Sequence, residues 1–410
     1  MPRVLLLLPT TTYRTKAYLD AARRVGVDVV AASEQASTMA AHNREGLLAL
    51  DLFNPDQAAQ QAQQYAAEHA IDAVIPVDED TAVAAAAIAD KLHLNQNPLN
   101  AARAAKNKHL MRDVLSQAGV RVPRYRAFSL DEDARTVAAQ LDYPCVVKPV
   151  FLSTSRGVMR ADNEEEFAHV VERLNRIVSD PKLARHGRDA SGEALVEEFI
   201  PGFEVAVEGL VTDGEFRVLA IFDKPDPLDG PFFEETIYIT PSRLSEEVQR
   251  DIIETTAAAT RAMGLRRGPV HAELRVNERG TYVIEVAART IGGLCARALK
   301  FGDGLSLEEI IIRHALGEDL RNIERERQAA GVMMIPIPRA GTLQVVFGVE
   351  HARQVADIED VIITAHLTQR VAPPPEGASY LGFIFSRAST PDRVEAALRQ
   401  AHARLEFIID

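Results

Sequence analysis

Two glutamates, Glu273 and Glu285, are the strongest candidates for chemistry, and they lie in a stretch with the pattern of a β-hairpin. Apolar residues alternate in both predicted strands, and the two apolar faces match only if the numbers of paired residues sum to an even value. A three-residue connection at 278–280, with Gly280 free to take a positive φ, satisfies this and places Glu273 directly opposite Glu285. Adjacent carboxylates repel each other, so the hairpin predicts a divalent cation with oxygen ligands. The alternative is a solvated polar face on which neighbouring arginines neutralise both acids.

A lysine and the loop that follows it form a second candidate site. Lys148 stands in an otherwise apolar predicted strand, where its ammonium needs a partner or an exit from the sheet. The loop at residues 153–157 offers three hydroxyls, backbone N–H groups and the guanidinium of Arg156, all of which suit phosphate oxygens. Lys108 lies in the first turn of a predicted helix, where the helix dipole disfavours a cation unless an anion is near. The alternatives are a solvent-exposed turn and a solvated helix end.

The composition narrows the classes of partner. There are 46 basic and 59 acidic residues, and the net charge of −13 argues against nucleic acid or an anionic membrane as the main partner. The two cysteines predict no disulfide framework and favour a reducing cytoplasm. The apolar run at residues 4–8 is too short for a signal sequence or a membrane span. We therefore expect a soluble, cytoplasmic protein, with a symmetric homodimer as the default if it is oligomeric.

The elements that must position these residues fall into three sections. Residues 1–95 alternate short apolar runs with helical patterns, which is typical of a parallel βαβ sheet, and they contain no glycine-rich dinucleotide fingerprint or P-loop. In this section we expect strands at 4–8, 27–31 and 73–77 and helices at 54–69 and 81–92. Later we expect strands at 141–150, 158–160, 194–199 and 205–211, helices at 107–118, 164–178 and 245–263, and a long proline-rich segment at 217–242. A mixed tail begins near residue 331.

Several motifs, taken in order, resemble the ATP-grasp superfamily over roughly residues 96–320. They are NKHLMRDVL, YPCVVKP, STSRGV, VEEFIPGFEVAV and the pair HAELRV and YVIEVAARTIGGL. In that family two lobes close over ATP, so the resemblance implies an ATP-grasp fold of mixed α/β and α+β class. The implied domains are a Rossmann-like N-terminal domain at 1–95, an ATP-grasp domain at 96–330 with a lid lobe at about 123–200 and a large lobe at about 201–330, and a C-terminal α+β subdomain at 331–410.

The resemblance also implies a role for each matching residue. The backbone carbonyl of Glu198 and the N–H of Ile200 would contact adenine, and Glu204 would bind the ribose hydroxyls. The implied ATP-binding residues are Lys108, Lys148, Ser153, Thr154, Ser155, Gly157, Glu197, Glu198, Phe199, Ile200 and Glu204. Glu273 and Glu285 would bind Mg²⁺ or Mn²⁺. This chain has Ala287 where many relatives carry asparagine, so the number of ions, one or two, stays open.

The variant EVAARTIGGL is similar to the L-amino acid ligases, which form dipeptides. That similarity implies an ADP-forming ligase of the peptide-synthase type that joins a carboxylate to an amine through an acyl phosphate. The implied catalytic residues are Arg289, Lys148 and Arg156, and the substrate candidates are Glu234, Glu235, His271, Gly292 and Gly293. An aromatic wall for the substrate would come from Phe232, Phe233 or Tyr238. The alternatives are a ligase or carboxylase of another small-molecule pathway, or a non-catalytic ATP-binding module; the sequence does not identify the amino acids.

Overall fold

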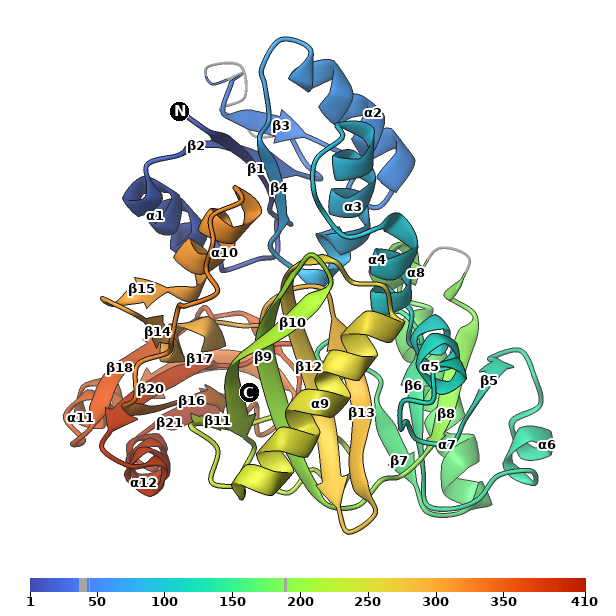
Figure 1. The fold of residues 1–410 in the computed structure, drawn as a ribbon. Coiled ribbons are helices and arrows are strands. Elements are labelled where there is room, and N and C mark those ends of the chain that lie inside the picture. Colours follow the sequence, from blue (N-terminus) through green and yellow to red (C-terminus); the bar gives the residue numbers. More distant parts are fainter. Residues whose placement is uncertain (37–42, 44, 188–189) are drawn as a thin grey trace.

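The computed structural model describes residues 1–36, 43, 45–187 and 190–410 (Figure 1). The N-terminal section is a four-stranded parallel sheet with strand order β3-β2-β1-β4. Its elements are β1 (Arg3–Leu7), α1 (Thr15–Val25), β2 (Asp28–Ser33), β3 (Leu47–Ala49), α2 (Pro55–Ala66), β4 (Ala73–Pro76), the short 3-10 helix η1 (Glu79–Thr81) and α3 (Ala82–Lys91). The three expected strands and two expected helices are confirmed, whereas β3 and α1 were not predicted. The fold of this section is Rossmann-like, as expected.

A small antiparallel sheet forms a separate layer at residues 125–198, with strand order β5-β8-β6-β7. Its strands are β5 (Tyr125–Ser129), β6 (Cys145–Pro149), β7 (Met159–Ala161) and β8 (Glu193–Glu198), accompanied by α6 (Ala134–Ala138), α7 (Glu164–Val178) and α8 (Pro181–Gly187). Helix α7 buries Phe167, Val171 and Leu174 against the sheet. Helices α4 (Leu99–Lys106) and α5 (Lys108–Gln117) connect this layer to the N-terminal section.

Eight of the remaining strands build one sheet with the order β13-β12-β9-β10-β11-β16-β20-β18. Its strands are β9 (Phe203–Thr212), β10 (Glu215–Asp223), β11 (Ile237–Thr240), β12 (Arg267–Asn277), β13 (Gly280–Ala287), β16 (Ala329–Ile335), β18 (Ile358–Ile363) and β20 (Gly382–Ala388). The proline-rich segment at 217–242 contains the end of β10 and all of β11, two strands that were not predicted. Because β16 starts at Ala329 and pairs with β11, the expected boundary after residue 330 falls inside a strand of a continuous sheet.

Helices and short strands cover this sheet. They are α9 (Glu246–Ala262), the 3-10 helix η3 (Cys295–Ala298), β14 (Lys300–Phe301), β15 (Leu305–Ser306), α10 (Leu307–Ala315), β17 (Gly341–Phe347), α11 (Val349–Arg353), β19 (Arg370–Val371), α12 (Pro391–His402) and β21 (Glu406–Ile409). Helix α10 lies beside α1, so the N-terminal section packs directly on the rest of the molecule (Figure 1). Within the described ranges, no helix has the length and apolar character needed to cross a bilayer.

The hairpin β12–β13 confirms the predicted pairing of the two acids, but its turn and register differ from the prediction. Glu273 pairs with Glu285, as expected. The turn is shorter than expected, because Asn277 pairs with Gly280 and leaves only two residues in the loop. The register then shifts at a β-bulge, with Ile284 as the extra residue of β13. The bulge frees the Ile284 carbonyl, which accepts a 2.6 Å hydrogen bond from Arg112.

Candidate active site

One cavity gathers most of the predicted site residues. Its lining comes from the small sheet, the large sheet, the β1 loop and the C-terminal strands. The predicted residues that line it are Lys108, Lys148, Thr154, Ser155, Glu197, Glu198, Phe199, Ile200, Glu204, Phe233, Glu235, Tyr238, His271, Glu273, Glu285, Arg289, Gly292 and Gly293. Five predicted residues do not line it: Ser153, Arg156, Gly157, Phe232 and Glu234.

The two lysines enter the cavity from different elements and have different partners. Asn107 caps helix α5 by accepting the N–H of Leu110 at 3.0 Å, which places Lys108 in the first turn. The Lys108 ammonium donates to the carbonyl of Leu152 at 2.7 Å and lies 3.2 Å from Glu285 Oε1. The Lys148 ammonium lies 2.5 Å from Glu197, and burial lowers its pKa.

The Glu197 carboxylate is engaged by two cations. One of its oxygens accepts from Arg112 Nε at 2.6 Å, and the other pairs with Lys148. Burial opposes its ionisation, but Arg112 and Lys148 lower the pKa of Glu197 below its usual value. Both carboxylate oxygens of Glu197 are therefore engaged, and the ion pair with Glu197 holds the Lys148 ammonium in position.

The polar loop brings only part of its length to the cavity. Thr154 and Ser155 line the cavity, and both have positive φ, 56° and 53°. Gly157, also at positive φ, donates its N–H to the carbonyl of Pro375 at 2.9 Å. Arg156 does not reach the cavity: its guanidinium is half-buried near Asp180 and Glu376, and burial lowers its pKa. In this arrangement the loop offers hydroxyls and backbone to a phosphate, but not the predicted arginine.

The hinge after β8 is held by backbone bonds and by arginines. The N–H of Phe199 donates to Pro144 at 3.1 Å, and the Ile200 carbonyl accepts from Arg275 at 2.6 Å. The side chain of Glu198 accepts hydrogen bonds from two arginines, at 3.1 and 3.2 Å, so its carboxylate is already occupied. The Glu204 carboxylate accepts from Arg275 at 2.9 Å. These contacts hold the hinge in place beside the cavity.

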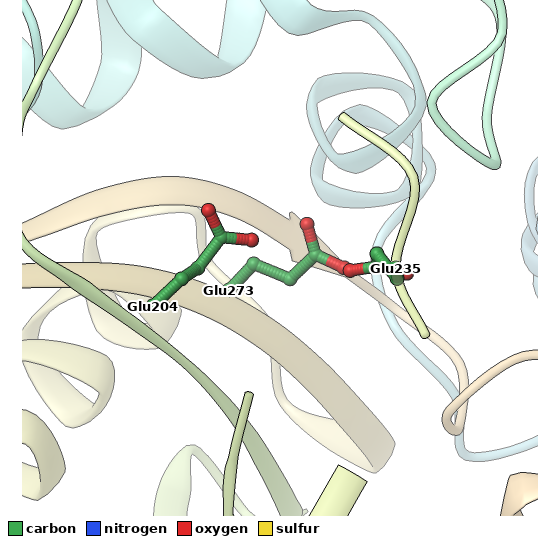
Figure 2. A group of neighbouring side chains, drawn as sticks. All are labelled: Glu204, Glu235 and Glu273. Atoms are coloured by element: carbon green, nitrogen blue, oxygen red, sulfur yellow. The ribbon is translucent and has the colours of Figure 1, made fainter. Parts of the chain in front are cut away.

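Glu273 belongs to a half-buried carboxylate cluster that the sequence did not reveal. Oxygens of Glu204, Glu235 and Glu273 all lie within 4.8 Å of one another (Figure 2). The ammonium of Lys224 enters this cluster, 2.8 Å from Glu204 and 3.5 Å from Glu273, and also contacts Glu235. Burial raises the pKa of Glu235 to about 7, and the charge of Glu273 contributes. Lys224 directly follows the last residue of β10. A lysine at this position is the sequence feature from which a cluster of acids around it could have been expected.

The donor set of Glu273 and Glu285 fits a divalent cation. The two carboxylates are register partners on adjacent strands, and each already faces an ammonium, Lys224 or Lys108. Carboxylate oxygens are the ligands that Mg²⁺ and Mn²⁺ prefer. Burial opposes the ionisation of Glu273, but Lys224 and His271 hold the pKa of Glu273 well below its usual value. The acid is therefore charged and ready to bind a cation.

Arg289 is held by the N-terminal section. The sequence suggested a salt bridge to Glu273 or Glu285, but the guanidinium lies 3.0 Å from Glu79 and donates to the carbonyl of Thr290 at 2.8 Å. Glu79 follows β4 at the carboxyl edge of the parallel sheet, where ligand-facing residues gather in such folds. Arg14, from the loop after β1, donates to the side chain of Thr290. Sequence reasoning missed both Glu79 and Arg14.

Of the two substrate candidates His271 and Glu234, only His271 lines the cavity. His271 Nδ1 lies 2.5 Å from Glu208, and although burial opposes protonation, Glu208 raises the pKa of His271 to about 9. His271 therefore lines the cavity as a cation. Glu234 does not line it, because its carboxylate accepts a hydrogen bond from the backbone of Ile337; its neighbour Glu235 lines the cavity instead.

Known proteins resemble this chain over its whole length. Three family models match it: the ATP-grasp N-terminal domain at residues 19–95, the ATP-grasp domain at 141–298 and the L-amino acid ligase C-terminal domain 2 at 333–410. Together they match most of the chain. The fold, the paired acids and these matches show that the chain is an ATP-grasp protein.

Within that superfamily it is an L-amino acid ligase-like protein. The crystal structure of an L-amino acid ligase from Bacillus licheniformis superposes with a TM-score of 0.80 at 26% identity, covering 100% of this chain and 99% of that one. The alanine–anticapsin ligase of Bacillus subtilis is 27% identical over 63% of this chain, and the match spans 56% of that ligase. An uncharacterised protein of Sinorhizobium fredii is 24% identical over 100% of this chain and 84% of its own length.

Proposed function

We propose that the protein is an ADP-forming ligase that joins two amino acids into a dipeptide. The observation that carries the proposal is the convergence of a metal-type carboxylate pair, two lysines and Arg289 on one cavity. Adenine binding alone would not require this set. A cytoplasmic location is part of the proposal, and both cysteines are free and buried, as suits a reducing compartment.

The reaction would proceed in two displacements. A carboxylate oxygen of the first amino acid attacks the γ-phosphorus of ATP, the bond to the β-phosphate oxygen breaks, and ADP leaves with the electron pair. The amine of the second amino acid, having lost a proton, then attacks the acyl carbon. The carbon–oxygen bond to phosphate breaks, inorganic phosphate leaves, and an amide remains.

The chain's own residues would bind and orient the reactants. Lys108 and Lys148 would hold phosphate oxygens, and Arg289 would face the charge that develops during phosphoryl and acyl transfer. Glu273 and Glu285 would hold Mg²⁺ or Mn²⁺, which would supply further neutralisation of phosphate charge. Thr154 and Ser155, between the small sheet and the cavity, would cover the phosphates and exclude water, which would otherwise hydrolyse the acyl phosphate.

The test is a phosphate-release screen of the full chain with ATP, Mg²⁺ and all pairs of amino acids, with mass spectrometry of the products. A dipeptide formed with one ADP per amide is the expected result. Phosphate release with bicarbonate but with no amino acid pair would favour a carboxylase instead. ATP binding without turnover under every mixture would favour a non-catalytic module. Glu285→Gln serves as the control for contaminating ATPase activity.

A further inference from the structure

Part of the cavity is walled by apolar and aromatic side chains that the proposed chemistry does not use. Six residues make up this apolar chamber: Tyr13, Tyr238, Ile291, Cys295, Met334 and Tyr380. They come from the loop after β1, from β11, from the turn that follows Arg289, and from β16 and the segment before β20. The chamber therefore exists only when the N-terminal section, the large sheet and the C-terminal strands are assembled.

Two of the chamber residues pack against the ring of Phe383. The rings of Tyr13 and Tyr380 lie 6.0 and 6.2 Å from the ring of Phe383. Gly293, at φ 60°, approaches the same ring so closely that a β-carbon there would lie 3.0 Å from Phe383. The predicted substrate glycine is thus part of the chamber floor, where any side chain would reduce the space.

The chamber is poor in charge and mostly buried. None of its six residues carries a formal charge at neutral pH, and Tyr238, Ile291, Cys295 and Met334 are each at most 4% exposed, whereas Tyr13 is 44% exposed. Burial raises the pKa of the Cys295 thiol. The acid beside the chamber, Glu235, is already paired with Lys224. A charged side chain entering here would lose its hydration and meet a pre-formed ion pair.

We propose that the apolar chamber receives the side chain of one of the two joined amino acids, and that this substrate carries a large apolar side chain. The inference rests on the proposed function for the identity of the ligand as an amino acid. The chamber residues determine which side chain is preferred. Their aromatic rings and the Met334 thioether favour aromatic, branched aliphatic and thioether side chains, because these bury the most apolar area and gain the most dispersion energy.

The first test is equilibrium binding of single amino acids to the full chain in the presence of Mg²⁺ and ADP, by calorimetry. Phenylalanine, leucine and methionine are expected to bind about tenfold or more tightly than glycine, aspartate and lysine. Equal affinity across these groups, tighter binding of a charged amino acid, or no binding of any amino acid would overturn the inference.

The second test changes the wall. Tyr380→Arg is expected to reverse the order, so that aspartate gains about tenfold over phenylalanine. Tyr380→Ala, which adds no charge, is expected to weaken phenylalanine binding several-fold and serves if the arginine variant does not fold. The matched control is Phe347→Arg, which places the same side chain at a 53% exposed aromatic residue of β17 outside the cavity; its amino acid preference should equal that of the wild type. An unchanged order in both Tyr380 variants would overturn the inference.

These measurements separate the inference from the proposed function. If apolar amino acids bind selectively but no pair of amino acids releases ADP, the ligase proposal fails while the chamber assignment stands. If ADP is released but only with small or charged amino acids, the chamber assignment fails while the ligase proposal stands.

Discussion

Glu273 and Glu285 are chemically identical and directly opposed on one hairpin, but their surroundings differ. Glu285 has one close ammonium, that of Lys108, which comes from a helix at the junction with the small sheet. Glu273 lies in a network with Lys224 and His271, and Lys224 also serves two further acids. Glu285 therefore depends on one ion pair, whereas Glu273 shares its partners with neighbouring acids in a larger charge network.

The largest expected effect comes from removing the charge of Glu285. Glu285→Gln should lower turnover by about 10³-fold, because the metal it would hold contributes several kcal/mol of transition-state stabilisation. Phosphate release with the amino acid pair that supports turnover measures this, and the melting temperature checks the fold. Turnover within a few-fold of the wild type would show that Glu285 is not a metal ligand.

The stability of the two acid variants should differ. Glu273→Gln leaves Lys224 and His271 less compensated in a buried setting, so we expect a loss of about 3 kcal/mol in the free energy of unfolding. Glu285→Gln, which deprives only Lys108, should lose about 1 kcal/mol. Urea denaturation in a chelating buffer measures both variants. Equal losses would remove the contrast drawn here.

The pH dependence of stability tests the network around Glu273. The pKa of His271 in the folded state, about 9, lies above its unfolded value of 6.5, so the folded state binds more protons between these values. The resulting stability is fully present below pH 6.5 and is lost as the pH rises through 9. We expect the free energy of unfolding, measured with a chelator, to fall by about 3 kcal/mol over that window. In Glu208→Gln the fall should be much smaller; an equally steep fall there would assign it to another group.

A smaller effect is expected from Glu79, the carboxylate that pairs with Arg289. Glu79→Gln should lower kcat about tenfold while leaving the KM for ATP unchanged, because Arg289 loses its 3.0 Å partner and its orientation. Glu79→Asp should recover part of the rate. Glu34→Gln is the matched control, since Glu34 follows β2 in the N-terminal section but lies outside the cavity. A rise in KM alone would mean that Glu79 contributes to binding and not to positioning.

The sequence predicted the local features of the site well. Alternation of apolar residues placed Glu273 opposite Glu285, and the order of motifs located Lys108, Lys148 and the hinge. The turn prediction was wrong by one residue, and the bulge at Ile284 compensated for it. The Ile284 carbonyl in the bulge accepts a hydrogen bond from Arg112, 172 residues away in the chain, and no local pattern encodes such a contact.

The sequence by itself therefore determined most strands and helices of the N-terminal section and the pairing of the two acids, because periodicity, caps and turns act over a few neighbouring residues. The expectation of an ATP-grasp fold came from the resemblance of its ordered motifs to that superfamily. The tertiary structure alone decided the rest. It joined Arg289 to Glu79 across 210 residues, turned Arg156 away from the cavity, placed Lys224 among three acids and closed an apolar chamber from three sections of the chain. Such contacts depend on how whole layers pack, since burial forces each charge to find a partner wherever the fold brings one.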